Sequence, residues 1–131
     1  MTLIERFPNS GAFVEDGPPY SRAVRLNEMV FVSGQVALDE AGKPVEGGIV
    51  PETRQTIENL RKVLQELGLD LKDVVKTMVW LTDVEDFGVF NSIYVEYFGE
   101  ALPARACVRA DLMGPFSVEI EAIALDGRQA R

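Results

Sequence analysis

The stretch from Asp73 to Thr82, DVVKTMVWLT, limits the possible folds of this chain more than any other part of its sequence. Its β-branched and aromatic residues predict a strand, because such side chains pack well on a pleated surface. Side chains alternate along a strand, so one face carries Val75, Thr77, Val79 and Leu81, and the other carries Val74, Met78 and Trp80. Only Lys76 interrupts the second face. A strand that is apolar on both faces must be covered on both sides.

Two amphipathic helices flank this strand along the chain. Residues 51–68 end at Gly68, a common helix stop, and their apolar stripe contains Ile57, Leu60, Leu64 and Leu67. Residues 83–99 begin at a predicted N-cap, Asp83, and carry an apolar stripe of Phe87, Phe90, Tyr94 and Tyr97. Gly88 lowers helix propensity, so we expect the amino-terminal half of the second helix to be less regular.

Four further strands are predicted from alternation and turn signals. Two of them surround the Asn27-Glu28 turn, and the others occupy residues 103–110 and 117–125. The order strand, strand, helix, strand, helix, strand, strand predicts a two-layer α+β domain with both helices on one face of the sheet. Met78 and Trp80 are then left without cover on the other face. A second copy of the chain is the simplest cover, so we expect a homo-oligomer.

Length and composition predict a globular protein with one domain over residues 1–131. The formal net charge of −8 and the pI of about 4.5 argue against a nucleic-acid partner, because such a surface repels phosphates. Glu5, Arg6 and Pro8 stand where a secretory signal needs an apolar core, and no stretch is long enough to cross a membrane. A single cysteine forms no internal disulfide. We therefore predict a cytoplasmic protein without a membrane partner.

The sequence contains no histidine. This absence removes the commonest general base, the Ser-His-Asp and Cys-His arrangements, and most zinc sites. Any acid–base chemistry must therefore use carboxylates, tyrosine, cysteine or lysine, and we predict no metal site.

The predicted strand 103–110, PARACVRA, places Arg105, Cys107 and Arg109 on one face. Arg105 is either a solvated or ion-paired surface arginine, or a bidentate clamp on a small carboxylate. Cys107 is either a small buried hydrophobe or a nucleophile, and the lack of a histidine partner disfavours the second interpretation. Its backbone groups are the better candidates for binding a ligand.

Glu119 and Glu121 share one face of the last predicted strand. They are either a solvent-facing pair or, because Ile123 and Leu125 continue that face, carboxylates on a half-buried surface. A half-buried carboxylate has a raised pKa and can hold or activate water.

Three other places have a structural and a functional interpretation. The Ser33-Gly34-Gln35 segment is either strand punctuation or a point where the backbone approaches a ligand, because glycine carries no Cβ. Tyr20 belongs either to the core or to the aromatic wall of a pocket, and Asn91 forms either a structural hydrogen bond or part of a pocket lining.

Several segments, in this order, resemble the RidA/YjgF family of enamine/imine deaminases. They are PPYSRAV, FVSGQVALD, TRQTIENLRKVLQELG, VVKTMVWLTDVEDFGVFNSIY, YFGEALPARACV and VEIEAIA, which together extend from about Pro18 to Leu125. The resemblance implies a chorismate-mutase-like α+β fold and a homotrimer with active sites between subunits. The implied reaction hydrolyses 2-aminoacrylate-type enamines or imines to a 2-oxo acid and ammonia, without a cofactor.

Position by position, the resemblance implies that Arg105 grips the substrate carboxylate and that Glu119 holds the hydrolytic water. The implied substrate-binding residues are Tyr20, Ser33, Gly34, Asn91, Arg105 and Cys107. Two features depart from the family pattern. Arg22 stands where glutamine is frequent, and the turn at 111–117 is shorter than usual and lacks the usual lysine. Both departures concern substrate preference more than reaction type.

Three alternatives stay open at this point. The first is a small-carboxylate-binding or chaperone-like protein that uses the same pocket without turnover. The second is a deaminase of one pathway, acting on an aminoacrylate or aminomuconate. The third is a ribonuclease, which the net charge of −8 and the absence of histidine argue against.

Overall fold

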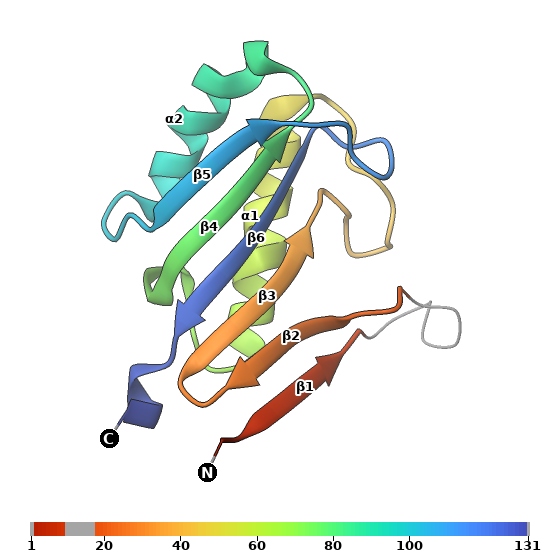
Figure 1. Cartoon of the computed structure of the whole chain (residues 1–131). Coiled ribbons are helices and arrows are strands. Elements are labelled where there is room, and N and C mark those ends of the chain that lie inside the picture. Colours follow the sequence, from red (N-terminus) through yellow and green to blue (C-terminus); the bar gives the residue numbers. More distant parts are fainter. Residues whose placement is uncertain (1, 10–17, 131) are drawn as a thin grey trace.

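A computed structural model describes residues 2–9 and 18–130 of the chain. In these residues two α-helices lie on one side of a six-stranded sheet (Figure 1). The main elements are β1 (Ile4–Pro8), β2 (Ser21–Leu26), β3 (Met29–Gln35), α1 (Ile49–Glu66), β4 (Val74–Leu81), α2 (Phe87–Phe98), β5 (Ala104–Arg109) and β6 (Val118–Leu125). The predicted α+β class is confirmed. The single-domain prediction over 1–131 includes residues 10–17, which lie outside the described residues.

The strand order across the sheet is β1-β2-β3-β6-β4-β5. β4 and β5 are parallel, and the other neighbouring pairs are antiparallel. The tight turn between β2 and β3 places Asn27 at a φ of 54°, a left-handed conformation that asparagine tolerates better than most residues. The sheet is therefore mixed, and β4 has a neighbouring strand on each side.

β1 is a strand that the sequence analysis did not predict. It pairs with β2 at the margin of the sheet, with Ile4 opposite Leu26 and Phe7 opposite Ala23. Four of its five residues are exposed, so it lacks the apolar alternation by which a half-buried strand is recognised. Backbone pairing with β2, rather than burial of side chains, defines this element.

β4 presents one apolar face to the helices, but its first residues depart from simple alternation. Thr77 and the alternate residues after it are buried, and the register with β6 shifts between Val74 and Lys76. This shift turns Val74 into the core and leaves Val75 48% exposed. The prediction that Val75 shares the face of Thr77 is therefore wrong. One extra residue in the strand pairing moves every side chain before it to the opposite face of the sheet.

α2 begins irregularly, as predicted from its amino-terminal half. Residues Val84–Asp86 form a short 3-10 helix, η2, and the Asp83 carboxylate accepts a 2.9 Å hydrogen bond from the Glu85 amide. Phe87 is the first residue of α2 and its side chain is 45% exposed. Its assignment to the buried stripe is therefore wrong, because the ring lies at the start of the helix, near Arg105, instead of in the core.

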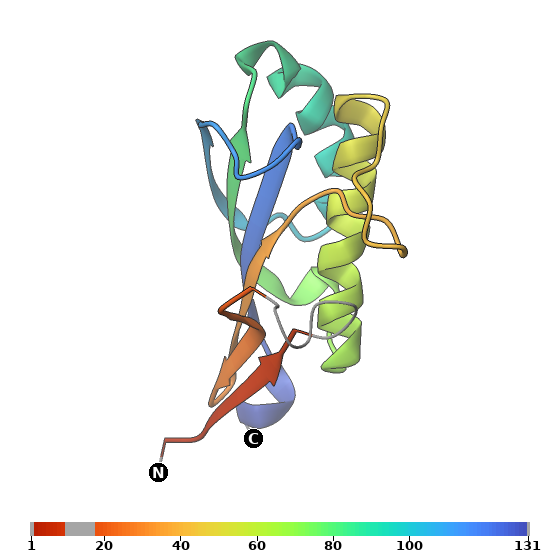
Figure 2. The same cartoon turned by 90° about the vertical axis from the view of Figure 1, so that its right-hand side faces the viewer.

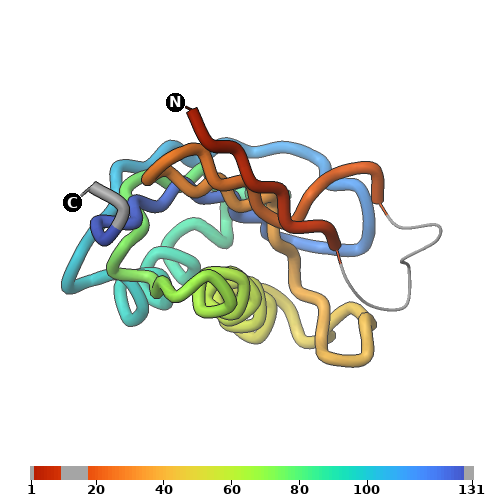
Figure 3. Tube along the Cα trace, turned by 90° about the horizontal axis from the view of Figure 1, so that it is seen from below, coloured from red at the N-terminus to blue at the C-terminus, as the bar shows by residue number. Residues whose placement is uncertain are grey.

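The hydrophobic core lies between the sheet and the helices, and no helix of the described residues covers the opposite face (Figure 2). Seen from below, the sheet and the helices form two separate layers (Figure 3). Met78 and Trp80 lie on the open face, partly buried among the side chains of neighbouring strands. None of the described helices is both long and apolar enough to cross a membrane.

Candidate functional site

Arg105 lies on the side of β5 that faces the helix layer. It pairs with the buried Thr77 of β4, so its side chain points toward α2. Nη1 donates a 2.8 Å hydrogen bond to Oδ1 of Asn91. The guanidinium carbon also lies near three aromatic ring centroids, at 5.8 Å from Phe87, 5.8 Å from Phe90 and 4.9 Å from Tyr94. Helical spacing places these rings and the amide on one side of α2, where together they hold the guanidinium.

The positive charge of Arg105 has no acidic partner in the described part of the chain. The ion pairs found there belong to Arg22, Arg25, Arg54, Arg61 and Arg128. One guanidinium donor of Arg105 is used by a neutral amide, and the others remain for a ligand. A planar guanidinium fork matches a carboxylate through two parallel hydrogen bonds.

Cys107 follows Arg105 on the same face of β5 and packs against the core. Burial raises the pKa of its thiol, and the nearby charge of Arg105 opposes this shift only in part. A thiol with a raised pKa supplies little thiolate at neutral pH. The geometry therefore favours the interpretation of this side chain as a small buried hydrophobe.

Glu119 lies on the open face of the sheet, where it pairs with Trp80 of β4. Partial burial raises the pKa of its carboxyl group, and the neighbouring charge of Glu121 raises it further. Gly34 makes room for this side chain, since a Cβ added at Gly34 would lie 2.3 Å from Oε2 of Glu119. A side chain at this position would therefore displace the carboxylate from the place that it occupies beside β3.

A pocket of about 210 Å³ opens beside the end of β3, and two predicted residues, Tyr20 and Gly34, line it. The other lining residues are Asn9, Pro18, Gln35, Val36, Leu38 and Asn59. Asn59 donates 2.9 Å hydrogen bonds to the carbonyls of Val36 and Leu38. Gln35 belongs to the Ser33-Gly34-Gln35 segment that the sequence singled out, whereas Asn59 was not predicted and no motif marks it. Asn59 belongs to α1, more than twenty residues along the chain from Val36 and Leu38, and only the folding of the chain brings these residues together.

Ser33 is not among the lining residues of this pocket. Its hydroxyl donates a 2.6 Å hydrogen bond to the carbonyl of Ser21 and so ties β3 to β2. In the described chain this side chain therefore has a structural role next to Gly34.

The structure brings the predicted residues together as two groups. One group contains Asn91, Arg105 and Cys107, and the other contains Tyr20, Gly34 and Glu119. Arg105 pairs with Thr77 and Glu119 pairs with Trp80. Because Thr77 and Trp80 are three residues apart on one strand, their side chains point to opposite faces of the sheet. Within one chain, the sheet therefore separates Arg105 from Glu119.

The sequence model of a family described as Endoribonuclease L-PSP matches residues 14–126. A Mus musculus protein named 2-iminobutanoate/2-iminopropanoate deaminase is 48% identical over 111 residues, which cover 83% of this chain and 82% of the relative.

The chain belongs to the RidA/YjgF family. The structure of RidA from an Antarctic Psychrobacter superimposes with a TM-score of 0.80 at 36% identity, over 92% of this chain and 94% of that one. A Thermotoga maritima protein described as a candidate endoribonuclease gives a TM-score of 0.84 at 41% identity, over 92% and 97% of the two chains. The resemblance seen in the sequence is therefore confirmed, together with the RidA/YjgF fold.

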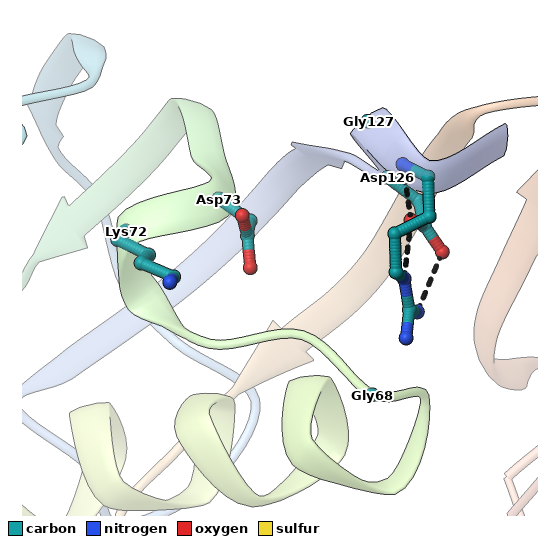
Figure 4. A pocket seen from close by; sticks show the side chains of 6 residues that line it. Gly68, Lys72, Asp73, Asp126 and Gly127 are labelled. Atoms are coloured by element: carbon teal, nitrogen blue, oxygen red, sulfur yellow. Dashed lines mark hydrogen bonds and ion pairs between the residues drawn. The ribbon is translucent and has the colours of Figure 1, made fainter. Parts of the chain in front are cut away.

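A second pocket of this RidA/YjgF chain, of about 460 Å³, contains none of the predicted residues (Figure 4). Its main feature is Asp126, which is fully buried and accepts hydrogen bonds from Arg128 at 2.8 and 2.9 Å and from Arg25 at 2.9 Å. These bonds, those of Arg128 above all, hold the pKa of Asp126 well below its usual range. The charges in this pocket already neutralise one another, so we assign it a structural role.

The described residues were also expected to contain no metal site. Within residues 2–9 and 18–130, no three His, Cys, Asp or Glu side chains are grouped closely enough to bind a metal ion.

Proposed function

We propose that this protein is an enamine/imine deaminase that hydrolyses 2-imino acids to 2-oxo acids and ammonia. The observation that carries the proposal is Arg105, whose guanidinium is held by an amide and three aromatic rings and has no acidic partner among the described residues. Such a group is prepared for a small carboxylate ligand. The names of the relatives support this assignment, since one of them is a 2-iminobutanoate/2-iminopropanoate deaminase at 48% identity.

In this mechanism Arg105 binds the substrate carboxylate through the donors that Asn91 leaves free. Binding orients the planar imine, and orientation is a large part of catalysis for a substrate this small. An enamine first gains a proton at carbon and loses one from nitrogen to become the imine, whose C=N carbon is electrophilic. Tyr20, Ser33, Gly34, Asn91 and Cys107 are the proposed remaining members of the binding site.

Glu119 is the proposed acid–base group. Its carboxylate holds a water molecule and accepts a proton as the oxygen attacks the imine carbon, forming a C–O bond and a tetrahedral carbinolamine. The same proton is then delivered to the former imine nitrogen, which becomes an amino group. Glu119 next takes the hydroxyl proton and passes it to this nitrogen, so that the C=O bond of the 2-oxo acid forms as the C–N bond breaks and ammonia leaves with the bonding pair. The raised pKa of Glu119 suits a group that both accepts and donates a proton near neutral pH.

We further propose that each active site combines residues of two protomers within a homotrimer. Two observations support this arrangement. Arg105 and Glu119 lie on opposite faces of the sheet in one chain, so a single protomer does not bring them to one substrate. The open face also carries Met78 and Trp80, which a neighbouring protomer would cover. The Arg105 group of one protomer would then meet the Glu119 group of the next.

The direct test is imine hydrolysis by the purified protein. A pyridoxal-phosphate dehydratase acting on serine supplies 2-aminoacrylate, and loss of the imine is followed by stopped-flow with and without catalytic amounts of this protein. We expect faster loss with the wild type, and a kcat that is lower by about 10²- to 10⁴-fold in Glu119→Gln. No acceleration by the wild type would refute the proposal.

The same variant separates catalysis from simple binding. A carboxylate-binding or chaperone-like protein needs Arg105 but not Glu119, so Glu119→Gln would then behave like the wild type in every assay. For the deaminase we expect this variant to bind pyruvate as the wild type does, by calorimetry, while its turnover is lost.

Mixed trimers test whether the site is shared. Arg105→Ala and Glu119→Gln protomers are unfolded, mixed in equal amounts and refolded together. A shared site is intact only when its Arg105 comes from a Glu119→Gln protomer and its Glu119 comes from an Arg105→Ala protomer. Random assembly gives this combination in roughly a quarter of the sites. We expect roughly a quarter of wild-type activity in the mixture and almost none in either variant alone. An inactive mixture of correctly assembled trimers would exclude the shared site.

A ribonuclease is the second candidate, because the family model carries the description Endoribonuclease L-PSP. The chain lacks histidine and has a net charge of −8, both unfavourable for binding and cleaving RNA. Cleavage of single-stranded RNA by the wild type, but not by Glu119→Gln, would favour this candidate over the deaminase.

A further inference from the structure

Arg22 occupies an irregular position in β2. Phe7 of β1 pairs with Ala23 and Pro8 pairs with Ser21, so Arg22 is left without a partner on β1. This two-against-one pairing is a β-bulge, which redirects the side chain of the extra residue. The redirected side chain of Arg22 reaches α1.

The guanidinium of Arg22 joins three segments that are distant in the sequence. Its Nε lies 2.9 Å from Oε2 of Glu66 near the end of α1, and the two side chains are 23% and 39% exposed. Its Nη1 donates to the carbonyl of Pro8 at the end of β1. The guanidinium carbon lies 5.9 Å from the centroid of the Phe7 ring. From β2, one side chain therefore contacts β1 through a hydrogen bond and α1 through a charge contact to Glu66 that lacks hydrogen-bond geometry.

The lining of the 210 Å³ pocket includes residues of the segments that Arg22 joins. Asn9, which directly follows Pro8, donates a 2.5 Å hydrogen bond to the carbonyl of Tyr20, and these two lining residues form what we call the Tyr20 wall. Asn59 of α1, the helix that also carries Glu66, is another lining residue. The ion pair therefore links the Tyr20 wall to the helix that carries Asn59.

We propose that Arg22 and Glu66 act as a positioning pair that sets the width of this pocket and thereby the size of the substrate side chain it admits. The inference rests on the proposed deaminase function. Arg22 contacts no proposed catalytic group, so its influence is on fit and not on the chemical step. Substrates with bulky side chains reach the Tyr20 wall and depend on its position, whereas 2-iminopropanoate, with only a methyl group, does not.

The test compares imines of alanine, leucine and phenylalanine, each produced in place by an amino acid oxidase. Arg22→Gln removes the charge but keeps a donor for the Pro8 carbonyl. We expect KM for the two bulky imines to rise by about three- to tenfold, as for the loss of a partly exposed ion pair. KM for 2-iminopropanoate and kcat for all three substrates stay within about twofold, because the reacting groups are unchanged.

Two further variants establish that the pair itself is responsible. Glu66→Gln is expected to produce the same change in selectivity, and the double reversal Arg22→Glu with Glu66→Arg is expected to restore it in part. Arg54→Gln is the matched control, because it breaks an exposed ion pair with Glu96 of equal length, 2.9 Å, between the two helices. This control is expected to keep wild-type selectivity.

A second readout does not depend on catalysis. Amide hydrogen exchange in residues 4–7 is expected to be faster in Arg22→Gln than in the wild type or Arg54→Gln. Binding of pyruvate and phenylpyruvate is measured alongside it, so that the pair can be judged even if the wild type hydrolyses no imine. Unchanged selectivity in Arg22→Gln, in turnover and in binding alike, overturns the proposal. Faster exchange without a change in selectivity also overturns it, since Arg22 would then only stabilise β1.

Discussion

Two arginine clusters of this molecule differ in how their charge is balanced. Around Asp126, Arg25 and Arg128 donate to a fully buried carboxylate over distances of 2.8 and 2.9 Å. Arg105 instead donates to the neutral amide of Asn91 and lies among aromatic rings. Hydrogen bonds orient the guanidinium groups in both clusters, but among residues 2–9 and 18–130 only the first cluster contains an acidic counter-charge.

The difference separates a structural arginine from one that is prepared for a ligand. A carboxylate that belongs to the chain forms a permanent ion pair, and the free energy of that pair contributes to folding. An arginine oriented by neutral groups keeps most of its affinity for an external carboxylate. The comparison therefore predicts that mutations in the two clusters change different measured quantities, activity in one case and stability in the other.

The largest effect in the comparison of the two arginine clusters is expected at Arg105. Arg105→Ala removes a charge-assisted contact to the substrate, and we expect kcat/KM for imine hydrolysis to fall by about 30-fold to several thousand-fold. The thermal unfolding midpoint should stay close to that of the wild type, since no ion pair of the described chain is lost. Arg109→Ala, an exposed arginine on the same face of β5, is the control and should retain activity. Wild-type rates in Arg105→Ala would refute its assigned role.

The second effect is expected at Asp126 and concerns stability. Asp126→Asn removes the charge that Arg25 and Arg128 share, and we expect the free energy of unfolding to fall by about 1–3 kcal/mol while kcat/KM is kept. The folded-state pKa of Asp126 lies below its unfolded value, so its contribution is present above about pH 4 and is lost as the pH falls through the folded-state pKa. Denaturant unfolding at several pH values measures both effects. A stable but inactive Asp126→Asn variant would contradict the conclusion that this cluster contributes to stability and not to activity.

The smallest effect is expected for Glu121→Gln and concerns the pH dependence of activity. It acts on Glu119, a charged group without an oppositely charged partner in the described residues. Burial and then Glu121 raise the pKa of its carboxyl group. Glu119 must be ionised to accept a proton from water, so kcat/KM should rise with pH through this pKa. Glu121→Gln removes the repulsion and should move that rise to lower pH. Glu58→Gln, on the outer side of α1, should leave the profile unchanged; an unmoved profile in Glu121→Gln would show that Glu119 does not govern it.

Most secondary structure could be predicted because it follows from local patterns. The stripe of α1 and the alternation in β6 each mark one buried face, so the helix layer and the sheet could be anticipated. β1 could not, because its side chains are mostly exposed and only its pairing with β2 defines it. Val75 was misplaced because the bulge in β4 depends on register with β6, and no pattern in the sequence records that register.

The candidate site divides in the same way. The alternation of PARACVRA and VEIEAIA placed Arg105 with Cys107 and Glu119 with Glu121, since neighbours two apart on a strand share a face whatever the fold. The residues that support them, such as Asn59 beside the pocket and Arg22 in its bulge, come together only through contacts between distant segments.

The sequence by itself therefore determined the fold class, the helix-facing stripes and the chemical types available to a site that has no histidine. These properties follow from side-chain periodicity and composition, which are local. Only the tertiary structure decided that Arg105 and Glu119 face opposite sides of the sheet and that Arg105 keeps its charge free of acidic partners among the described residues. Both depend on strand order and register, which arise when segments far apart in the chain pack together.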